Sequence, residues 1–208
     1  MEILELAQAP DGAYTALADM FAARKRVFID LLGWELPVRN ERFEVDQFDD
    51  AEAAYLLLGR AGLPHRGSAR LLRTEKPHIL GDLFPSLCAG PIPRGPNVRE
   101  ITRFCIDPGL SRSEQREARN ELVSALALHA AETGITTYTA VAGLTWFRQI
   151  SRFGWDCRAL GEPRKVDGEA LVGLEIKIST NTVSCLAATG ILREPNYNVL
   201  RLQEGAWS

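Results

Sequence analysis

Residues 99–106 read Arg-Glu-Ile-Thr-Arg-Phe-Cys-Ile and alternate as a strand does. Shortly afterwards Ser111 and Glu114 form a Ser-x-x-Glu capping box, which predicts a helix from there to about Glu132, stopped by Gly134. The next predicted elements are a strand, a helix and a second strand, over 135–142, 144–153 and 171–178. A strand, a helix and further alternating elements are typical of an α/β domain.

Upstream of this stretch, apolar residues recur at helical spacing over 14–32, and Gly33 ends the predicted helix. Residues 35–52 hold seven acidic residues and predict a long loop. Two short apolar runs, 53–59 and 67–73, predict an antiparallel hairpin joined by a turn. The whole order indicates an α/β (α+β) fold with a mixed sheet whose faces are both partly covered.

The rest of the chain is less informative. Glycine and proline over 90–96 predict a surface excursion rather than a domain linker, and residues 181–208 are weakly patterned. The chain has 208 residues, and a single core of this size buries well over half of its unfolded surface. We therefore expect one domain over 1–208.

Charge and composition exclude several classes of function. The 24 basic and 27 acidic residues give a net charge of −3, which argues against a nucleic-acid partner. The three histidines have no neighbour at metal-ligand spacing, so we expect no metal site. The four cysteines form no C-x-x-C pair, so we expect the protein to lie in the reducing cytoplasm. The acidic N-terminus lacks signal-peptide character, and no apolar run approaches the ~18 residues of a membrane span.

Three sequence clusters are candidates for chemistry, together with an arginine inside an apolar strand. An aromatic pair can contact a cation, an aspartate can bind an ammonium group, and an arginine can bind both oxygens of a carboxylate. The combination indicates an amino-acid-like ligand that carries all three groups. The clusters are Arg24-x3-Phe28-x5-Trp34, Asp46-x2-Asp49 and Glu100-x2-Arg103, and the strand arginine is Arg70.

These residues, in this order, resemble the LuxI-type acyl-homoserine lactone (autoinducer) synthases. The resemblance covers about residues 20–178, and its further motifs are Gly67-Ser-Ala-Arg70-Leu-Leu, Pro77-His-Ile-Leu-Gly-Asp-Leu-Phe-Pro85, Gly154-Trp155 and Val166-Asp-Gly168.

The resemblance implies a single-domain fold like that of the GNAT acyltransferases, with a central twisted mixed sheet, a V-shaped splay and flanking helices. It also implies two substrates, S-adenosylmethionine and an acyl thioester on acyl carrier protein or coenzyme A, and no separate cofactor. The products are an N-acyl-homoserine lactone for quorum sensing and 5′-methylthioadenosine. We expect a cytoplasmic monomer or weak dimer.

The resemblance and the residue chemistry together assign roles. Glu100 is the expected base that removes a proton from the amine, because an α-amino group titrates near pH 8. Backbone N–H groups around Arg103–Cys105 are expected to polarise the thioester carbonyl. The expected catalytic residues are Glu100, Arg103 and Asp46, and those expected to bind S-adenosylmethionine are Arg24, Phe28, Trp34, Asp46, Asp49, Arg70, Arg103 and Phe104.

On a regular strand Glu100 and Arg103 would point to opposite faces, so we expect a bulge or splay near 101–104. The position that carries threonine in relatives using 3-oxo acyl chains falls at Ala142 in a gap-free placement from Gly154, which favours an unsubstituted chain. A slip of one to three residues would place Thr139 or Thr145 there instead. Arg148 and Arg152 lie at i, i+4 on the predicted helix and are the expected docking site for acidic acyl carrier protein. The expected acyl pocket comprises Leu122, Val141, Ala142, Trp146, Phe147 and Leu174.

Two other functions remain open at this stage. A GNAT-like acetyl-coenzyme A N-acetyltransferase would need a glycine-rich pyrophosphate loop, but residues 106–113 contain one glycine. A non-catalytic small-molecule sensor on the same scaffold would not need Glu100 beside the full set of arginines and aspartates.

Overall fold

The computed structural model describes residues 13–59 and 64–202, which form two compact units. The first unit comprises residues up to Arg70, then Arg103–Leu122, and the chain from Pro195 onward. The second comprises Leu71–Thr102 and Val123–Glu194. Three elements run through both units: the strands β4 and β5 and the helix α2. Their bounds are Gly67–Arg73, Val98–Ile106 and Arg112–Thr133.

The first unit begins with the predicted N-terminal helix. It consists of an α-helix, α1 (Ala13–Arg24), that continues as a π-helical segment, η2 (Lys25–Leu31). Gly33 then adopts a φ of +71°, and the N–H of Trp34 donates to the carbonyl of Phe28 at 2.9 Å. Glycine accepts this left-handed conformation without strain, so it ends the helix where the sequence predicts.

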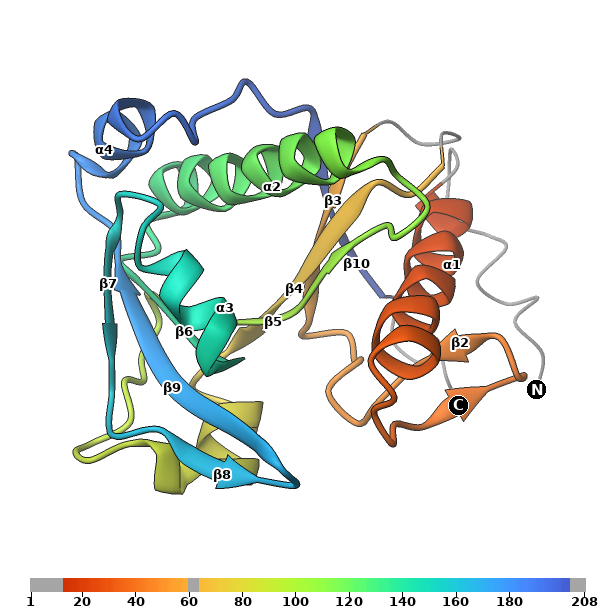
Figure 1. Cartoon of the computed structure of the whole chain (residues 1–208), viewed down its shortest axis with the longest axis horizontal. Coiled ribbons are helices and arrows are strands. Elements are labelled where there is room, and N and C mark those ends of the chain that lie inside the picture. The colour runs from red at the N-terminus through yellow and green to blue at the C-terminus, as the bar shows by residue number, and fades with distance from the viewer. Residues whose placement is uncertain (1–12, 60–63, 203–208) are drawn as a thin grey trace. The chain divides into compact units, whose positions relative to one another are not determined.

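The sequence predicts a long loop over 35–52, but part of this acidic segment forms strands. Two short strands, β1 (Val38–Arg39) and β2 (Phe43–Glu44), pair antiparallel within it. Asn40 and Glu41 make the turn between them with φ values of +50° and +56°. Because α1 contacts β2, this small hairpin brings the acidic segment against the N-terminal helix (Figure 1).

The sheet of the first unit runs in the order β10–β3–β4–β5. All five residues of β3 (Ala54–Leu58) are buried, in keeping with its apolar sequence. The sequence did not predict β10 (Tyr197–Arg201), which pairs antiparallel with β3. All five of its residues are exposed or half-buried, so it lacks the apolar pattern of a core strand. The predicted turn between 53–59 and 67–73 includes residues 60–63, which lie outside the described residues.

The second unit has the strand order β4–β5–β6–β9–β7, and β8 also pairs with β9. Strand β9 is long, and β7 and β8 pair antiparallel with its two ends (Figure 1). The elements of this unit are η3 (Ile79–Leu83), η4 (Pro85–Leu87), β6 (Thr137–Gly143), α3 (Leu144–Ile150), β7 (Asp156–Ala159), β8 (Arg164–Val166), β9 (Glu169–Lys177) and α4 (Thr182–Ala188).

Several boundaries in the second unit differ from the sequence predictions. Helix α3 ends at Ile150 rather than Phe153, because Arg152 donates its N–H to Gln149 three residues back, as in a turn. Strands β7 and β8 were not predicted, since most of their side chains are exposed. The capping box of α2 is confirmed: the Ser111 N–H donates to Glu114 at 2.8 Å.

Strand β5 runs without a break from Val98 to Ile106, but its pairing with β6 covers only its first three residues. Val98, Arg99 and Glu100 pair in parallel with Thr137, Tyr138 and Thr139, and the ladder between β5 and β6 extends over these three pairs. Three residues further on, Arg103 has a φ of +49°, which is rare for a residue with a side chain. The left-handed residue breaks the alternation of side chains, so the expected bulge or splay near 101–104 is confirmed.

Among the described residues, no helix has both the length and the apolar character that a bilayer crossing requires.

Candidate functional site

The first unit contains a buried network of three arginines and three carboxylates. Arg24, at the end of α1, donates from Nε to Glu44 at 2.5 Å and from its two terminal nitrogens to Asp49 at 2.8 Å each. Its side chain is 1% exposed. A guanidinium with all three nitrogens on carboxylates is held in one position, so Arg24 ties α1 to the acidic segment.

The other two arginines come from the neighbouring strands β4 and β5. Arg70 donates to both oxygens of Asp46 at 2.6 and 3.0 Å, and its Nη1 lies 2.7 Å from Asp49. Arg103 donates to Asp46 at 2.6 Å and to Glu44 at 3.0 Å. Each carboxylate therefore contacts two arginines, and three positive charges balance three negative ones.

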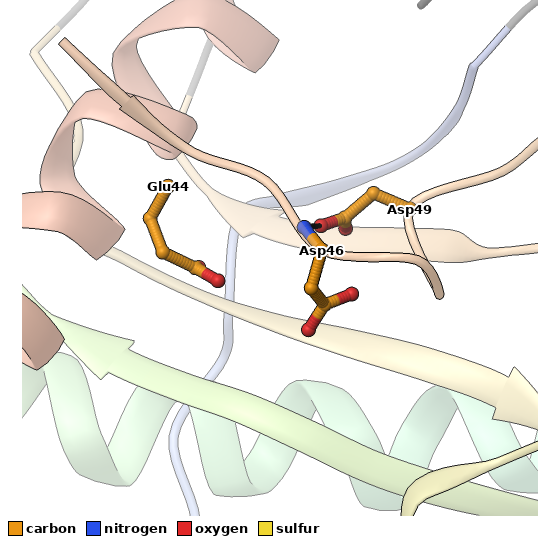
Figure 2. A group of neighbouring side chains, drawn as sticks. All are labelled: Glu44, Asp46 and Asp49. Carbon is orange, nitrogen blue, oxygen red and sulfur yellow. Dashed lines mark hydrogen bonds between the residues drawn. The ribbon is translucent and has the colours of Figure 1, made fainter. Parts of the chain in front are cut away.

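Local hydrogen bonds shape the chain around the acids. The Asp46 N–H donates to Asp49 at 2.9 Å, and the Phe48 N–H donates to Asp46 at 2.9 Å. The Tyr55 hydroxyl, from β3, donates to Asp49 at 2.9 Å. Figure 2 shows the three acids on one short stretch of chain, with Asp49 turned back toward the peptide nitrogen of Asp46.

Burial and charge act in opposite directions in this network. Burial alone would raise the pKa of Asp49, but Arg24 and Arg70 outweigh it and hold that pKa well below its usual range. Burial would lower the pKa of Arg24, but Asp49 and Glu44 raise it above its ordinary value. Burial and the nearby Asp49 raise the pKa of Tyr55. Asp49 and Arg24 are therefore charged at neutral pH, and the tyrosine is a neutral donor.

The three acids also have the spacing of a cation site. Oxygen atoms of Glu44, Asp46 and Asp49 lie within 4.8 Å of one another. Three guanidinium groups already contact these carboxylates, so we interpret the cluster as an ion-pair network rather than as a metal centre.

An aromatic pair lies in the same unit. Phe28 and Trp34 stack with their ring centroids 5.0 Å apart at an interplanar angle of 25°, and the Arg103 guanidinium lies 5.5 Å from the Phe28 centroid. Phe28 is buried, whereas Trp34 is 40% exposed. An exposed indole that is held against a second ring offers a ready face to a cation or a planar group. Phe104, the remaining aromatic residue predicted for this site, is half-buried on β5.

Glu100 belongs to the second unit and has a different environment. Its buried carboxylate accepts the N–H groups of Ile79 and Leu80, at the start of η3, at 2.7 Å each. Two backbone donors stabilise the ionised form of a carboxylate. The Asp82 carboxylate in turn accepts the His78 N–H at 2.6 Å, which fixes the turn that supplies the two donors.

Sequence reasoning missed two members of the buried network, Glu44 and Tyr55. Glu44 was one of seven acids in the segment 35–52 and had no distinguishing spacing. Its place in β2, two residues before Asp46, is set by the unpredicted hairpin. Tyr55 looked like an apolar strand residue, and only its contact with Asp49 shows its polar role.

The residues predicted to form the acyl pocket lie on several surfaces. Ala140 pairs with Leu174 and Ala142 with Val172, so these side chains share one face of the β6–β9 pair. Val141 pairs with Gly173 and therefore faces the other way. Trp146 and Phe147 are half-buried on α3, and Leu122 is buried in the first unit.

Arg148 and Arg152 are both exposed, as a docking site requires. They do not form a stripe on one helix face, because α3 ends at Ile150 and Arg152 lies in the turn that follows. The buried thiol of Cys105 has its pKa raised to about 12 by burial, so it is protonated at neutral pH and is a poor nucleophile.

Comparisons with known proteins identify the family. The family model for autoinducer synthases matches residues 12–186. An acyl-homoserine-lactone synthase from Ralstonia nicotianae is 32% identical over 188 residues, which cover 87% of this chain and 90% of that protein. One from Acinetobacter baumannii is 31% identical and covers 81% of this chain and 94% of that protein.

Solved structures give the same result. TofI, in a ternary complex with an inhibitor and MTA, matches with a TM-score of 0.72 and 31% identity over 84% of this chain and 90% of that one. BjaI, a CoA-dependent acyl-homoserine lactone synthase with SAM and isopentyl-CoA, matches with a TM-score of 0.76 and 26% identity over 85% and 82%. An N-acetyltransferase from Lactobacillus plantarum, 21% identical over 78% and 90%, shares the fold with a TM-score of 0.53, which confirms the predicted GNAT-like architecture. The chain belongs to the autoinducer synthase family and is an acyltransferase of the acyl-homoserine-lactone synthase type.

Proposed function

We propose that this enzyme transfers the acyl group of a thioester to the α-amine of S-adenosylmethionine and then closes the lactone ring. In the first step the amine nitrogen attacks the thioester carbonyl, the thiol leaves, and a base takes the proton. In the second step the carboxylate attacks the carbon beside the sulfonium, the carbon–sulfur bond breaks, and 5′-methylthioadenosine leaves. The observation that carries the proposal is the buried arginine–carboxylate network next to the stacked Phe28–Trp34 pair, in a chain of this family.

Exposure within the network suggests which members contact the substrate. The side chains of Asp46 and Arg103 are 6% and 8% exposed, whereas that of Arg70 is fully buried. Arg24 and Asp49 are similarly enclosed. We infer that Asp46 binds the ammonium group and Arg103 the carboxylate, while the enclosed members hold these two in position.

Trp34 would bind the sulfonium end of the same substrate. The indole is exposed enough for contact, and a cation against an aromatic face is worth about 0.5–2 kcal/mol. Phe28 would support this wall from the interior of the unit, and the half-buried Phe104 on β5 is the other aromatic residue expected to contact this substrate.

Glu100 is the proposed base. Two backbone N–H groups hold its carboxylate, and a carboxylate can take up a proton directly or through a water molecule. The ladder from β5 to β6 ends at Glu100, and we propose that backbone N–H groups just beyond, around Arg103–Cys105, polarise the thioester carbonyl.

Acyl carrier protein and coenzyme A are both candidate donors. The exposed Arg148 and Arg152 would attract an acidic carrier protein. The acyl chain would pack against α3 and β6, where Trp146, Phe147 and Val141 are half-buried and accessible.

The direct test is to incubate the protein with S-adenosylmethionine and a panel of acyl-carrier-protein and acyl-coenzyme A thioesters, with detection of products by mass spectrometry. We expect an N-acyl-homoserine lactone and 5′-methylthioadenosine in equal amounts. Binding of S-adenosylmethionine without turnover on any thioester would favour the sensor, and acetylation of a simple amine by acetyl-coenzyme A would favour an acetyltransferase.

A further inference from the structure

Strand β10 lies at an open edge of the sheet in the first unit. The strand order begins with β10, and among the described residues the strand that pairs with it is β3. An edge strand turns a row of backbone N–H and C=O groups to its outer side, and a further strand can pair with them. The outer side of β10 is therefore a candidate surface for association with another chain.

The pairing with β3 decides which residues of β10 face that outer side. The Gly59 N–H donates to the Asn196 carbonyl at 2.8 Å, and the register continues from there without a bulge over all five residues of β10. Alternate residues of an antiparallel strand exchange hydrogen bonds with the same neighbour. Asn198 and Leu200 therefore turn their backbone groups to β3, and Val199 between them turns its N–H and C=O to the outer side.

β10 lacks the features that usually protect an edge strand from pairing, which are lysines, prolines and bulges. Its five residues include no lysine or proline, and its register has no bulge. The Arg201 guanidinium donates to the Glu52 carbonyl at 3.1 Å, and the Asn198 amide donates to the Gly59 carbonyl at 2.8 Å. Both polar side chains therefore reach toward the two ends of β3 and leave the outer side of β10 uncovered.

The strand at the other end of the strand order, β7 in the second unit, is protected. It has four residues, and two of them, Asp156 and Arg158, are charged and exposed. Directly after it, the Leu160 carbonyl accepts the Ala89 N–H at 2.9 Å. A short, charged strand whose continuation is already bonded offers little to a further strand, so β10 is the edge that is suited to pairing.

The sequence of β10 is complementary to itself when a second copy runs antiparallel about a two-fold axis at Val199. Val199 then lies opposite Val199 of the second copy, where the two residues exchange both backbone hydrogen bonds. The Val199 side chain is 37% exposed, and β-branched side chains pair favourably across strands. Asn198 lies opposite Leu200 and Arg201 opposite Tyr197, so no like charges face one another.

We propose that two copies of this chain form a weak two-fold dimer through antiparallel pairing of their β10 strands, centred on Val199. Symmetric dimers of this kind are the commonest assemblies of soluble proteins. An edge of five residues buries much less than the ~1,600 Å² of a standard interface, so we expect an association that depends on protein concentration. The inference goes beyond the proposed function, because no residue assigned to a substrate lies in β10.

The test is sedimentation analysis of the full chain over a range of protein concentrations. The mass of the wild type should rise from 23.0 kDa toward twice that value as the concentration approaches about 1 mM. Val199→Pro removes the outward N–H and leaves the bonds to β3 in place, which an edge strand tolerates. Val199→Lys places two like charges at the two-fold axis. Both variants should remain monomeric over the whole range.

Leu83→Lys is the matched control, because Leu83 is 52% exposed on η3 in the second unit and undergoes the same change from apolar to charged. This variant should dimerise as the wild type does. Melting temperatures show that the variants are folded, and Val199→Lys decides the test if proline lowers that temperature. A wild type that stays monomeric would overturn the inference, as would a dimer that Val199→Lys retains, because that dimer would use another surface.

Discussion

The arginine–carboxylate network of the first unit and the Glu100 carboxylate of the second are stabilised in different ways. In the network, Arg24, Arg70 and Arg103 balance three acids, and three of the six arginine–carboxylate contacts are bidentate. At Glu100, two backbone N–H groups donate to the carboxylate. The first arrangement pairs charged side chains from several elements, whereas the second depends on the turn that supplies the two donors.

The two arrangements suit different roles: the enclosed network residues hold the substrate-binding groups in place, and Glu100 takes part in the reaction. The three arginines and three carboxylates have no net charge and each contacts two partners. They fix the conformation of the acidic segment, because moving any one of them leaves another buried charge unpaired. A carboxylate such as that of Glu100 can take up a proton. We therefore expect substitutions of the enclosed network members Arg24, Arg70 and Asp49 to act mainly on stability, and substitution of Glu100 to act mainly on kcat.

The largest expected effect on stability comes from Arg24→Ala. Removing this guanidinium takes one positive partner from each of the buried carboxylates Glu44 and Asp49. Breaking a buried ion pair in this way lowers the free energy of unfolding by about 3–5 kcal/mol. Arg26→Ala is the control, because Arg26 is half-exposed, pairs with Asp107 at 2.9 Å and should cost less than about 1 kcal/mol. Urea unfolding measures both, and equal losses would contradict a special role for the network.

The corresponding test in the second unit is Glu100→Gln. We expect kcat to fall by about 10²–10⁴-fold, the range for loss of a general base. The free energy of unfolding should also fall, by about 1–3 kcal/mol, because the glutamine NH2 cannot accept one of the two backbone N–H groups. Steady-state rates and urea unfolding on the same preparations separate the two effects. A variant that folds and keeps the wild-type rate would remove Glu100 from the base role.

Acid should destabilise the network selectively. Arg24 and Arg70 hold the pKa of folded Asp49 below that of the unfolded chain, which is about 3.9. The folded state then binds fewer protons, so this contribution is present above about pH 4 and is lost as the pH falls further. The free energy of unfolding of wild type should drop more steeply below pH 4 than that of Asp49→Asn, and parallel curves would contradict this.

The smallest expected effect is on substrate affinity at the aromatic pair. Trp34→Ala should raise KM for S-adenosylmethionine by about 2- to 30-fold, which corresponds to 0.5–2 kcal/mol of cation–aromatic contact. Trp34→Phe should keep most of the affinity, because a face remains beside Phe28. The prediction fails if alanine and phenylalanine give the same KM.

Much of the site was predictable because its residue types are unusual for their positions. An arginine inside the apolar run Gly67–Leu72 requires an acidic partner, and Asp46 supplies it. The helix end at Gly33 and the irregularity near Arg103 also follow from local rules on glycine and on strand alternation. By contrast, nothing in the spacing of Glu44 distinguished it from its acidic neighbours.

The sequence by itself determined the family, the order of the main elements and the residues that carry charge, because these depend on residue type and on periods along the chain. Only the tertiary structure decided which acid meets which arginine, that Val141 and Leu174 face opposite ways, and that Thr139 stands beside Glu100. Such pairings depend on strand register, and a shift of one residue moves every side chain to the other face.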